Sequence, residues 1–195
     1  MQGRILQGIG SFYTVESGEA CYVCKARGRF RKQRITPMVG DLVEFTPAPD
    51  AESEGSIEEI LPRSSELIRP PVANIDLLLV TLAAAAPDPD LLLADRLLVR
   101  AQRAGIEACI VVNKTDLSEN IVQEIRSQYE KSGYRVLTVC AREQIGLDEL
   151  KALARGRIVA FAGQSAVGKS TLMNILPGVL PMDKGSIVFQ GKRIE

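Results

Sequence analysis

Hydrophobic and polar residues alternate in short segments from Gly3 to about Glu66, and Gly or Pro separates one segment from the next. A period of two residues is typical of strands that bury one face. Five such strands in about sixty residues predict a small closed barrel of the OB type, while a small open sheet would have the same spacing. The expected strands are residues 4–9, 11–15, 20–26, 41–46 and 55–60.

A short proline-containing segment, Arg69-Pro70-Pro71-Val72-Ala73, follows the barrel pattern. Proline fixes φ and disfavours helix in the residue before it, so the segment predicts a stiff, extended connection. We therefore expect a domain boundary here, with a barrel domain in residues 1–68 and a second domain in residues 69–195.

The pattern changes after this connection to continuous apolar strands at residues 75–82, 108–112, 136–139 and 158–161. Strands that are apolar on both faces are typical of parallel sheets covered by helices. Helical periodicity separates them at residues 89–104, 119–132 and 147–154. The alternation predicts an α/β domain, in which ligands bind at the carboxyl ends of the strands.

Composition narrows the class of protein. The 24 Lys and Arg residues balance 24 Asp and Glu residues, so any nucleic-acid surface must come from local charge. The longest apolar run, residues 77–86, is too short to span a bilayer, and residues 1–10 lack the apolar core of a signal peptide. We therefore expect a cytoplasmic protein without a membrane partner.

The four cysteines are scattered, which favours reduced thiols over a disulfide scaffold. Cys21 and Cys24 form a C-x-x-C pair, but the chain has no histidine and no second close cysteine pair to complete a tetrahedral site. We therefore expect no zinc site in this chain.

A phosphate-binding loop follows the last predicted strand. Residues Gly163-Gln164-Ser165-Ala166-Val167-Gly168-Lys169-Ser170 match G-x-x-x-x-G-K-[ST] between a strand and a helical segment that begins at Thr171. The loop's N–H groups and the first helical residues, Thr171 included, would surround the phosphates. Lys169 would reach the β- and γ-phosphates, and the Ser170 hydroxyl would bind Mg²⁺. The alternative is a glycine-rich turn before a helix.

A base-reading motif comes directly after the strand at residues 108–112. Asn113-Lys114-Thr115-Asp116 matches N-K-x-D, in which a carboxylate accepts hydrogen bonds from guanine N1–H and the exocyclic amine. Adenine lacks both donors and would leave Asp116 unpaired. Asn113 would orient the loop and Lys114 would lie along the ring. The alternative is a simple helix N-cap formed by Asp116 or Ser118.

A third segment, Cys140-Ala141-Arg142, follows the strand at residues 136–139, where GTPases carry S-A-K and touch the base through its backbone. We therefore add Cys140 and Ala141 to the nucleotide-binding residues. Ordinary GTPases place the phosphate loop before N-K-x-D, whereas here it comes after. The order predicts a circular permutation, which compact domains with neighbouring termini tolerate.

With a small barrel in front, this permuted order resembles the ribosome small-subunit-dependent GTPase A (RsgA) family. The stretches A-R-G-R-F-R-K at residues 26–32, I-T-P-M-V-G-D at 35–41 and E-L-I-R-P-P-V-A-N-I-D at 66–76 also look like that family. The resemblance covers about residues 2–176. It implies an OB-fold RNA-binding domain followed by a circularly permuted P-loop GTPase domain.

The resemblance also implies a function. A protein of this kind would bind GTP or GDP with Mg²⁺, bind the small (30S) ribosomal subunit and its rRNA, and hydrolyse GTP during late maturation of that subunit. We expect it to act as a monomer.

Other features of the family do not match. Its switch threonine, its D-x-x-G motif and its Cys- and His-containing zinc domain are not found in these 195 residues, and Asp183-Lys184-Gly185-Ser186 is not D-x-x-G. We therefore expect this chain to bind GTP more readily than it hydrolyses it.

Two rival functions remain open at this point. Residues 185–192 also resemble the strand after the phosphate loop of ABC-transporter ATPases, which suggests an ABC-type ATPase fragment. The other rival is an RNA-binding barrel with a degenerate nucleotide domain. A preference for GDP over ADP would separate the three hypotheses, because only the first reads guanine.

A run of cations lies in the barrel domain, with one aromatic residue and no carboxylate inside it. By charge alone it could be a solvated hairpin. On a barrel that resembles a ribosome-binding family, it predicts a phosphate-binding stripe with a stacking platform. The expected RNA-binding residues are Lys25, Arg27, Arg29, Phe30, Arg31, Lys32 and Arg34.

Overall fold

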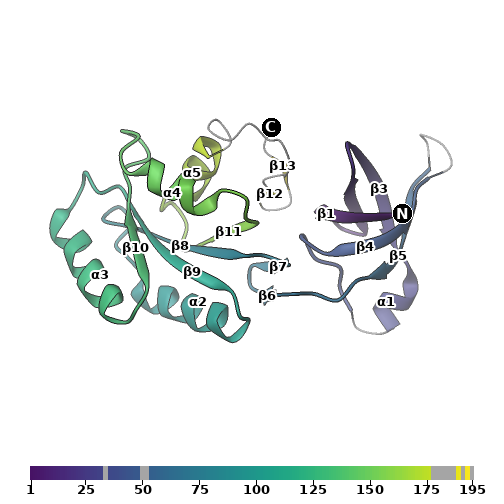
Figure 1. Cartoon of the computed structure of the whole chain (residues 1–195), viewed down its shortest axis with the longest axis horizontal. Coiled ribbons are helices and arrows are strands. Elements are labelled where there is room, and N and C mark those ends of the chain that lie inside the picture. The colour runs from purple at the N-terminus through teal and green to yellow at the C-terminus, as the bar shows by residue number, and fades with distance from the viewer. Residues whose placement is uncertain (33–34, 49–52, 177–187, 190–191, 194–195) are drawn as a thin grey trace. The chain divides into compact units, whose positions relative to one another are not determined.

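The computed structural model describes residues 1–32, 35–48, 53–176, 188–189 and 192–193. It divides into two compact units, of which the first runs from Met1 to Asn74 and the second begins at Ile75 (Figure 1). Two short strands near the C-terminal end, β12 (Val188–Phe189) and β13 (Lys192–Arg193), belong to the first unit.

The first unit is a closed five-stranded barrel in the order β1-β2-β3-β5-β4, which confirms the predicted OB-type fold. Only β3 and β5 pair in parallel among the barrel strands that are described. The strands are β1 (Gln2–Ile9), β2 (Phe12–Ser17), β3 (Ala20–Ala26), β4 (Leu42–Thr46) and β5 (Gly55–Ile60).

Alternate side chains of these strands fill the barrel. All five strands contribute to its buried core, as the two-residue period predicts. The helix α1 (Gly28–Lys32) between β3 and β4 adds one aromatic ring to it. The core residues are Ile5, Val15, Cys24, Phe30, Val43, Phe45 and Ile57.

The segment expected to be an extended connection is instead a hairpin. β6 (Glu66–Ile68) pairs antiparallel with β7 (Pro71–Ala73), and Leu67 and Ala73 are buried. Asn74 holds the end of this hairpin against the barrel loop, because its amide donates to the Gly40 carbonyl over 3.0 Å and its oxygen accepts from Ser64 N over 2.8 Å. The first unit therefore extends to Asn74, a few residues beyond the expected boundary.

A buried ion pair fixes the same loop. The Asp41 side chain is fully buried, and Arg63 donates to its two oxygens from Nε and Nη2 over 2.7 and 2.8 Å. The Met38 backbone N–H also donates to Asp41, and Arg63 reaches the Thr36 carbonyl over 2.9 Å. Because both partners lose hydration, the pair stabilises the fold only while it is complete.

The second unit is a parallel four-stranded sheet in the order β10-β9-β8-β11, with helices on both faces. α2 and α3 lie against one face and α4 and α5 against the other (Figure 1). This confirms the predicted α/β domain. Its elements are β8 (Leu77–Ala83), α2 (Leu91–Arg103), β9 (Glu107–Asn113), α3 (Glu119–Lys131), β10 (Arg135–Thr138), α4 (Leu147–Ala154), β11 (Val159–Ala162) and α5 (Lys169–Ile175).

Burial explains why these strands could be predicted from continuous apolar runs. Every residue of β8 is buried, because strands pair on both sides of it and helices cover both faces. Within the described part of the chain, no helix is long and apolar enough to cross a membrane.

Replacing Asp41 with Ala should destabilise the barrel by about 3 kcal/mol, since it leaves the Arg63 guanidinium without its main buried partner. Hydrogen exchange of barrel-strand amides measures this loss. As a control, Arg126→Ala removes an exposed pair with Glu130 and should cost less than about 0.5 kcal/mol. Equal effects of the two substitutions would contradict a structural role for the Asp41–Arg63 pair.

Candidate nucleotide-binding site

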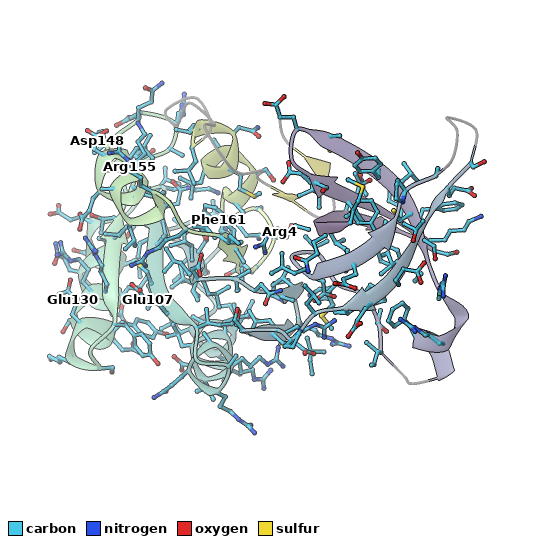
Figure 2. The ribbon with its side chains drawn as sticks, turned by 45° about the vertical axis from the view of Figure 1, so that its right-hand side comes forward. Arg4, Glu107, Glu130, Asp148, Arg155 and Phe161 are labelled. Carbon is cyan, nitrogen blue, oxygen red and sulfur yellow. The ribbon has the colours of Figure 1, made fainter. Side chains whose placement is uncertain are left out.

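The carboxyl ends of the parallel strands bring the three predicted motifs to one edge of the sheet. The phosphate loop follows β11, N-K-x-D follows β9, and the segment that begins at Cys140 follows β10. Phe161, labelled in Figure 2, lies on β11 two residues before the phosphate loop. β8 lies between β9 and β11, so the phosphate loop and N-K-x-D come from strands that are not neighbours.

Two glycines of the phosphate loop make contacts that leave no room for a side chain. Gly163 has φ 147°, and a Cβ there would lie 2.2 Å from the Thr81 carbonyl oxygen on β8. Gly168 has φ 95°, and a Cβ would lie 2.2 Å from the Asn113 amide nitrogen. The glycines therefore let the loop pack directly on the two strands beside it.

Lys169 lies at the start of α5 and folds back over the loop. Its ammonium donates to the carbonyls of Gly163, over 2.8 Å, and Gln164. Burial lowers the pKa of Lys169 from its ordinary value. The positive charge is thus held within the loop, where the motif requires it.

The other loop residues divide between anchors and exposed positions. Val167 is fully buried and Ala166 adopts a left-handed conformation, so the chain turns sharply between them. The Gln164 side-chain oxygen accepts from the Asp90 backbone N–H over 2.9 Å at the start of α2. Ser165, Ser170 and Thr171 are exposed, which leaves their hydroxyls open to a ligand or to Mg²⁺.

Asn113 joins the three motifs. Its side chain is buried, donates to the Val167 carbonyl over 2.9 Å and accepts from the Ala141 backbone N–H over 3.1 Å. One amide therefore ties the phosphate loop to the segment after β10. This positions Asn113 as a structural organiser of the site and supports the loop-orienting role expected of it.

Asp116 is exposed and accepts a hydrogen bond from the Cys140 thiol over 3.2 Å. The N-cap of α3 is Ser118, whose hydroxyl accepts from Ile121 N. The N-cap alternative is therefore confirmed for Ser118 and wrong for Asp116. Burial, with Asp116 and Glu143 nearby, raises the pKa of Cys140, so its thiol stays protonated and can donate.

Lys114 adopts a left-handed conformation, with φ 59°, and its ammonium donates to the Ala86 carbonyl after β8. The N-K-x-D loop is thereby tied to the neighbouring strand end as well. Asp116, Cys140 and Glu143 also present three ligand atoms within 4.8 Å of one another. These are the groups that could hold a cation here, but guanine would require the same Asp116 carboxylate.

The predicted RNA-binding stripe is only partly free in the structure. Lys25 pairs with Glu54 over 3.2 Å and Arg27 with Glu58 over 2.8 Å, because the parallel pairing of β3 with β5 brings these acids alongside. Arg29 is exposed, whereas Arg34 and the side chains of Arg31 and Lys32 fall outside the described residues.

Phe30 does not form the expected stacking platform. Its ring is 5% exposed and belongs to the barrel core, with the Arg29 guanidinium 5.4 Å from its centre. The α1 helix turns this one apolar residue inward, while its neighbour Arg29 stays exposed. The prediction of an exposed Phe30 ring is therefore wrong.

Sequence reasoning missed the aromatic residue that is accessible. Phe12 is 41% exposed at the start of β2, and the Lys25 ammonium lies 4.8 Å from the centre of its ring. Since Val15 faces the core, alternation along β2 turns Phe12 outward. That alternation was the available signal.

The fold and the site define a P-loop nucleotide-binding domain in which the base motif precedes the phosphate loop, which is the circularly permuted order. The RsgA GTPase model matches residues 60–193, and the RsgA N-terminal domain model matches residues 2–57. The chain belongs to the RsgA GTPase family. Because the match extends to residue 193, the ABC-type ATPase alternative is not favoured.

Curated relatives agree with this assignment. The small ribosomal subunit biogenesis GTPase RsgA of Ruminiclostridium cellulolyticum is 45% identical over 187 residues, which are 95% of this chain and 61% of that protein. Its counterpart in Alkaliphilus metalliredigens is 44% identical over 91% of this chain and 62% of that protein. The chain therefore spans less than two thirds of the length of these relatives.

Two solved structures have the same fold. YjeQ from Thermotoga maritima has a TM-score of 0.74 and 35% identity over 92% of this chain and 66% of that one. YloQ, described as a circularly permuted GTPase, has a TM-score of 0.68 and 34% identity over 91% of this chain and 65% of that one.

Asn113→Ala should loosen the phosphate loop even without nucleotide, because it leaves the Val167 carbonyl and the Ala141 N–H unpaired. We expect amides at residues 164–168 to lose about 2 kcal/mol of protection in hydrogen exchange. Asp116→Ala, which removes the part-buried hydrogen bond from the Cys140 thiol but no contact with the phosphate loop, is the matched control and should leave them unchanged. Equal protection in both variants and the unmodified chain would show that the backbone alone holds the loop.

Proposed function

We propose that this chain binds GTP and GDP with Mg²⁺ at the edge formed by the three motifs. The observation that carries this proposal is the bridge made by Asn113, which joins the phosphate loop to the segment that begins at Cys140. A glycine-rich turn with no ligand role does not account for a buried amide that joins three loops, nor for a lysine turned into the loop.

Each residue has a chemical role in this proposal. Phosphate and Mg²⁺ are held by the loop amides, Lys169 and the Ser170 hydroxyl. Lys169 and Mg²⁺ neutralise the charge on the β- and γ-phosphates. Asp116 accepts from guanine, and the Cys140 thiol fixes the direction of its carboxylate. Ala141 presents its backbone to the base.

The activity we propose is hydrolysis of GTP, in the cytoplasm, by a monomeric factor that acts on the small ribosomal subunit during its maturation. This is supported by the curated relatives, which are named small ribosomal subunit biogenesis GTPases. We propose that the barrel binds the subunit's rRNA through the cations around α1 and through Phe12, in place of Phe30. Stacking on an exposed ring and contacts to phosphate are the two common components of binding to unpaired RNA.

The unmodified chain should bind GDP at least about a hundredfold more tightly than ADP, and Asp116→Ala should remove most of that preference. Each charge-assisted hydrogen bond to guanine contributes about 1.5 to 3 kcal/mol. Calorimetric titration of both nucleotides with Mg²⁺ provides the measurement. Asp148→Ala is the control, because this carboxylate is fully exposed on α4.

Asp116→Asn makes the test sharper. Xanthine carries a carbonyl where guanine has its exocyclic amine, so an amide donor at residue 116 should bring a preference for xanthosine diphosphate over GDP. Equal GDP and ADP affinities in the unmodified chain would overturn the guanine assignment.

For the barrel, reversing Arg29, Arg31 and Lys32 to Glu should weaken binding to small ribosomal subunits. The log–log salt slope should flatten by about 0.7 to 0.9 for each phosphate that the variant no longer binds. Phe12→Ala should weaken binding about tenfold because one base can no longer stack, with little change in slope. Val23→Ala, an exposed apolar position on β3, is the control. Unchanged binding by the charge-reversal and Phe12 variants would show that this surface of the barrel does not bind the subunit.

A further inference from the structure

An unpaired arginine face on α2, distinct from the barrel stripe, is the strongest feature that the nucleotide site does not use. Arg96, Arg100 and Arg103 are spaced four and three residues apart, which places them on one side of the helix. All three are exposed. Figure 2 shows long side chains that end in nitrogen projecting from α2 on the side away from the sheet.

No described carboxylate pairs with these three arginines. In the described part of the chain, none of the three has a carboxylate within 4.0 Å. Arg126 and Arg157 of the same unit contrast with them, since each has a Glu within 3.1 Å. Three positive charges on one helix face repel one another, and that cost is offset when an anion binds.

The acidic residue of α2 does not neutralise this face. Asp95 accepts a hydrogen bond from the Tyr129 hydroxyl of α3 over 2.8 Å, so its carboxylate is engaged at the flank of the helix. The buried residues of α2, among them Leu97 and Leu98, lie on the opposite side against the sheet. The arginine face is therefore the outward face of the domain.

Stabilisation of the helix explains only part of the pattern. Arg100 and Arg103 lie in the last turn, where cations interact favourably with the helix dipole. Arg96 lies nearer the middle of the helix, beyond the range of that effect. The interaction with the helix dipole also does not depend on which side of the helix carries the charge, whereas these three arginines share one side.

We propose that this face of α2 binds the phosphate backbone of ribosomal RNA, as a second RNA-binding surface on the nucleotide-binding unit; this inference rests on the proposed function. Arg96 to Arg103 covers about 10 Å of helix axis. A duplex carries about one charge per 1.7 Å, so each guanidinium can meet a phosphate. Guanidinium groups match phosphate oxygens in a bidentate fork.

A membrane surface fits the face less well. Helices that lie on a bilayer insert a broad apolar face beside the basic one, whereas the apolar side of α2 is packed in the core. Only Leu92 and Val99 are exposed large hydrophobic residues of α2. RNA is therefore the polyanion that the described surface favours.

The test uses the full chain with Arg96, Arg100 and Arg103 all changed to Gln. Dissociation constants for small ribosomal subunits and for protein-free small-subunit rRNA are measured over a range of salt concentrations. The log–log salt slope should fall by about 2 to 3, the value for three bound phosphates. At moderate salt the affinity for both should fall by about tenfold or more. The corresponding triple Lys variant should keep the slope, because it keeps the charges.

The control variant changes Arg126, Lys131 and Lys151 to Gln, which removes the same charge from α3 and α4. Glu130, labelled in Figure 2, marks the C-terminal end of α3. The control should keep nearly the full slope. Retained GDP binding and unchanged hydrogen exchange in α2 would show that the arginine variant is folded.

Four results would overturn the proposal. An unchanged slope in the arginine variant would show that this face of α2 does not bind RNA phosphates. An equal effect in the control variant would show that only the overall positive charge of the chain matters. Weaker binding to subunits with unchanged binding to protein-free rRNA indicates a ribosomal protein as the partner. If the unmodified chain binds neither subunits nor rRNA, the proposed RNA partner is itself wrong, whereas guanine selectivity is tested separately by Asp116.

Discussion

The geometry of the candidate nucleotide site depends on the buried amide of Asn113. β8 separates β9 from β11, so backbone pairing does not connect the end of β9 to the phosphate loop. The Asn113 side chain crosses that gap to Val167 and also holds Ala141. The same arrangement requires glycine at residue 168, where a Cβ would displace the amide. Without the amide, two buried backbone groups would have no partners, so the site is organised before any ligand arrives.

This bridge also explains why the reversed order of motifs preserves the geometry of the site. Asn113 and Val167 are 54 residues apart in the chain, and their hydrogen bond depends only on the order of strands in the sheet. β11 pairs with β8 in parallel register from Val159 opposite Leu77 to Ala162 opposite Val80. Any connection that delivers β11 to that edge presents the phosphate loop to Asn113. The geometry belongs to the sheet, so a permuted chain retains it.

Local patterns were enough to predict the strands of the barrel, the α/β order and the motif loops, because each of them depends on neighbours in sequence. Features that depend on long-range pairing were not predictable in the same way. Glu58 lies 31 residues from Arg27 and becomes its partner only through the parallel pairing of β3 with β5. The burial of Phe30 could not be predicted because its neighbours in sequence are charged. A single inward residue in a five-residue helix also produces no periodic pattern.

The balanced charge of the chain conceals an uneven distribution. Strand pairing supplies carboxylates to Lys25 and Arg27, whereas nothing described covers the outward side of α2. In the RNA complex that we propose, the paired cations of the barrel remain available, since an exposed ion pair is stabilised by less than about 1 kcal/mol. A phosphate can therefore replace Glu54 or Glu58 at small cost. Among the described residues, the arginines of α2 have no such carboxylate to release. In the RNA complex that we propose, each of them therefore gains more from a phosphate than a paired cation of the barrel does.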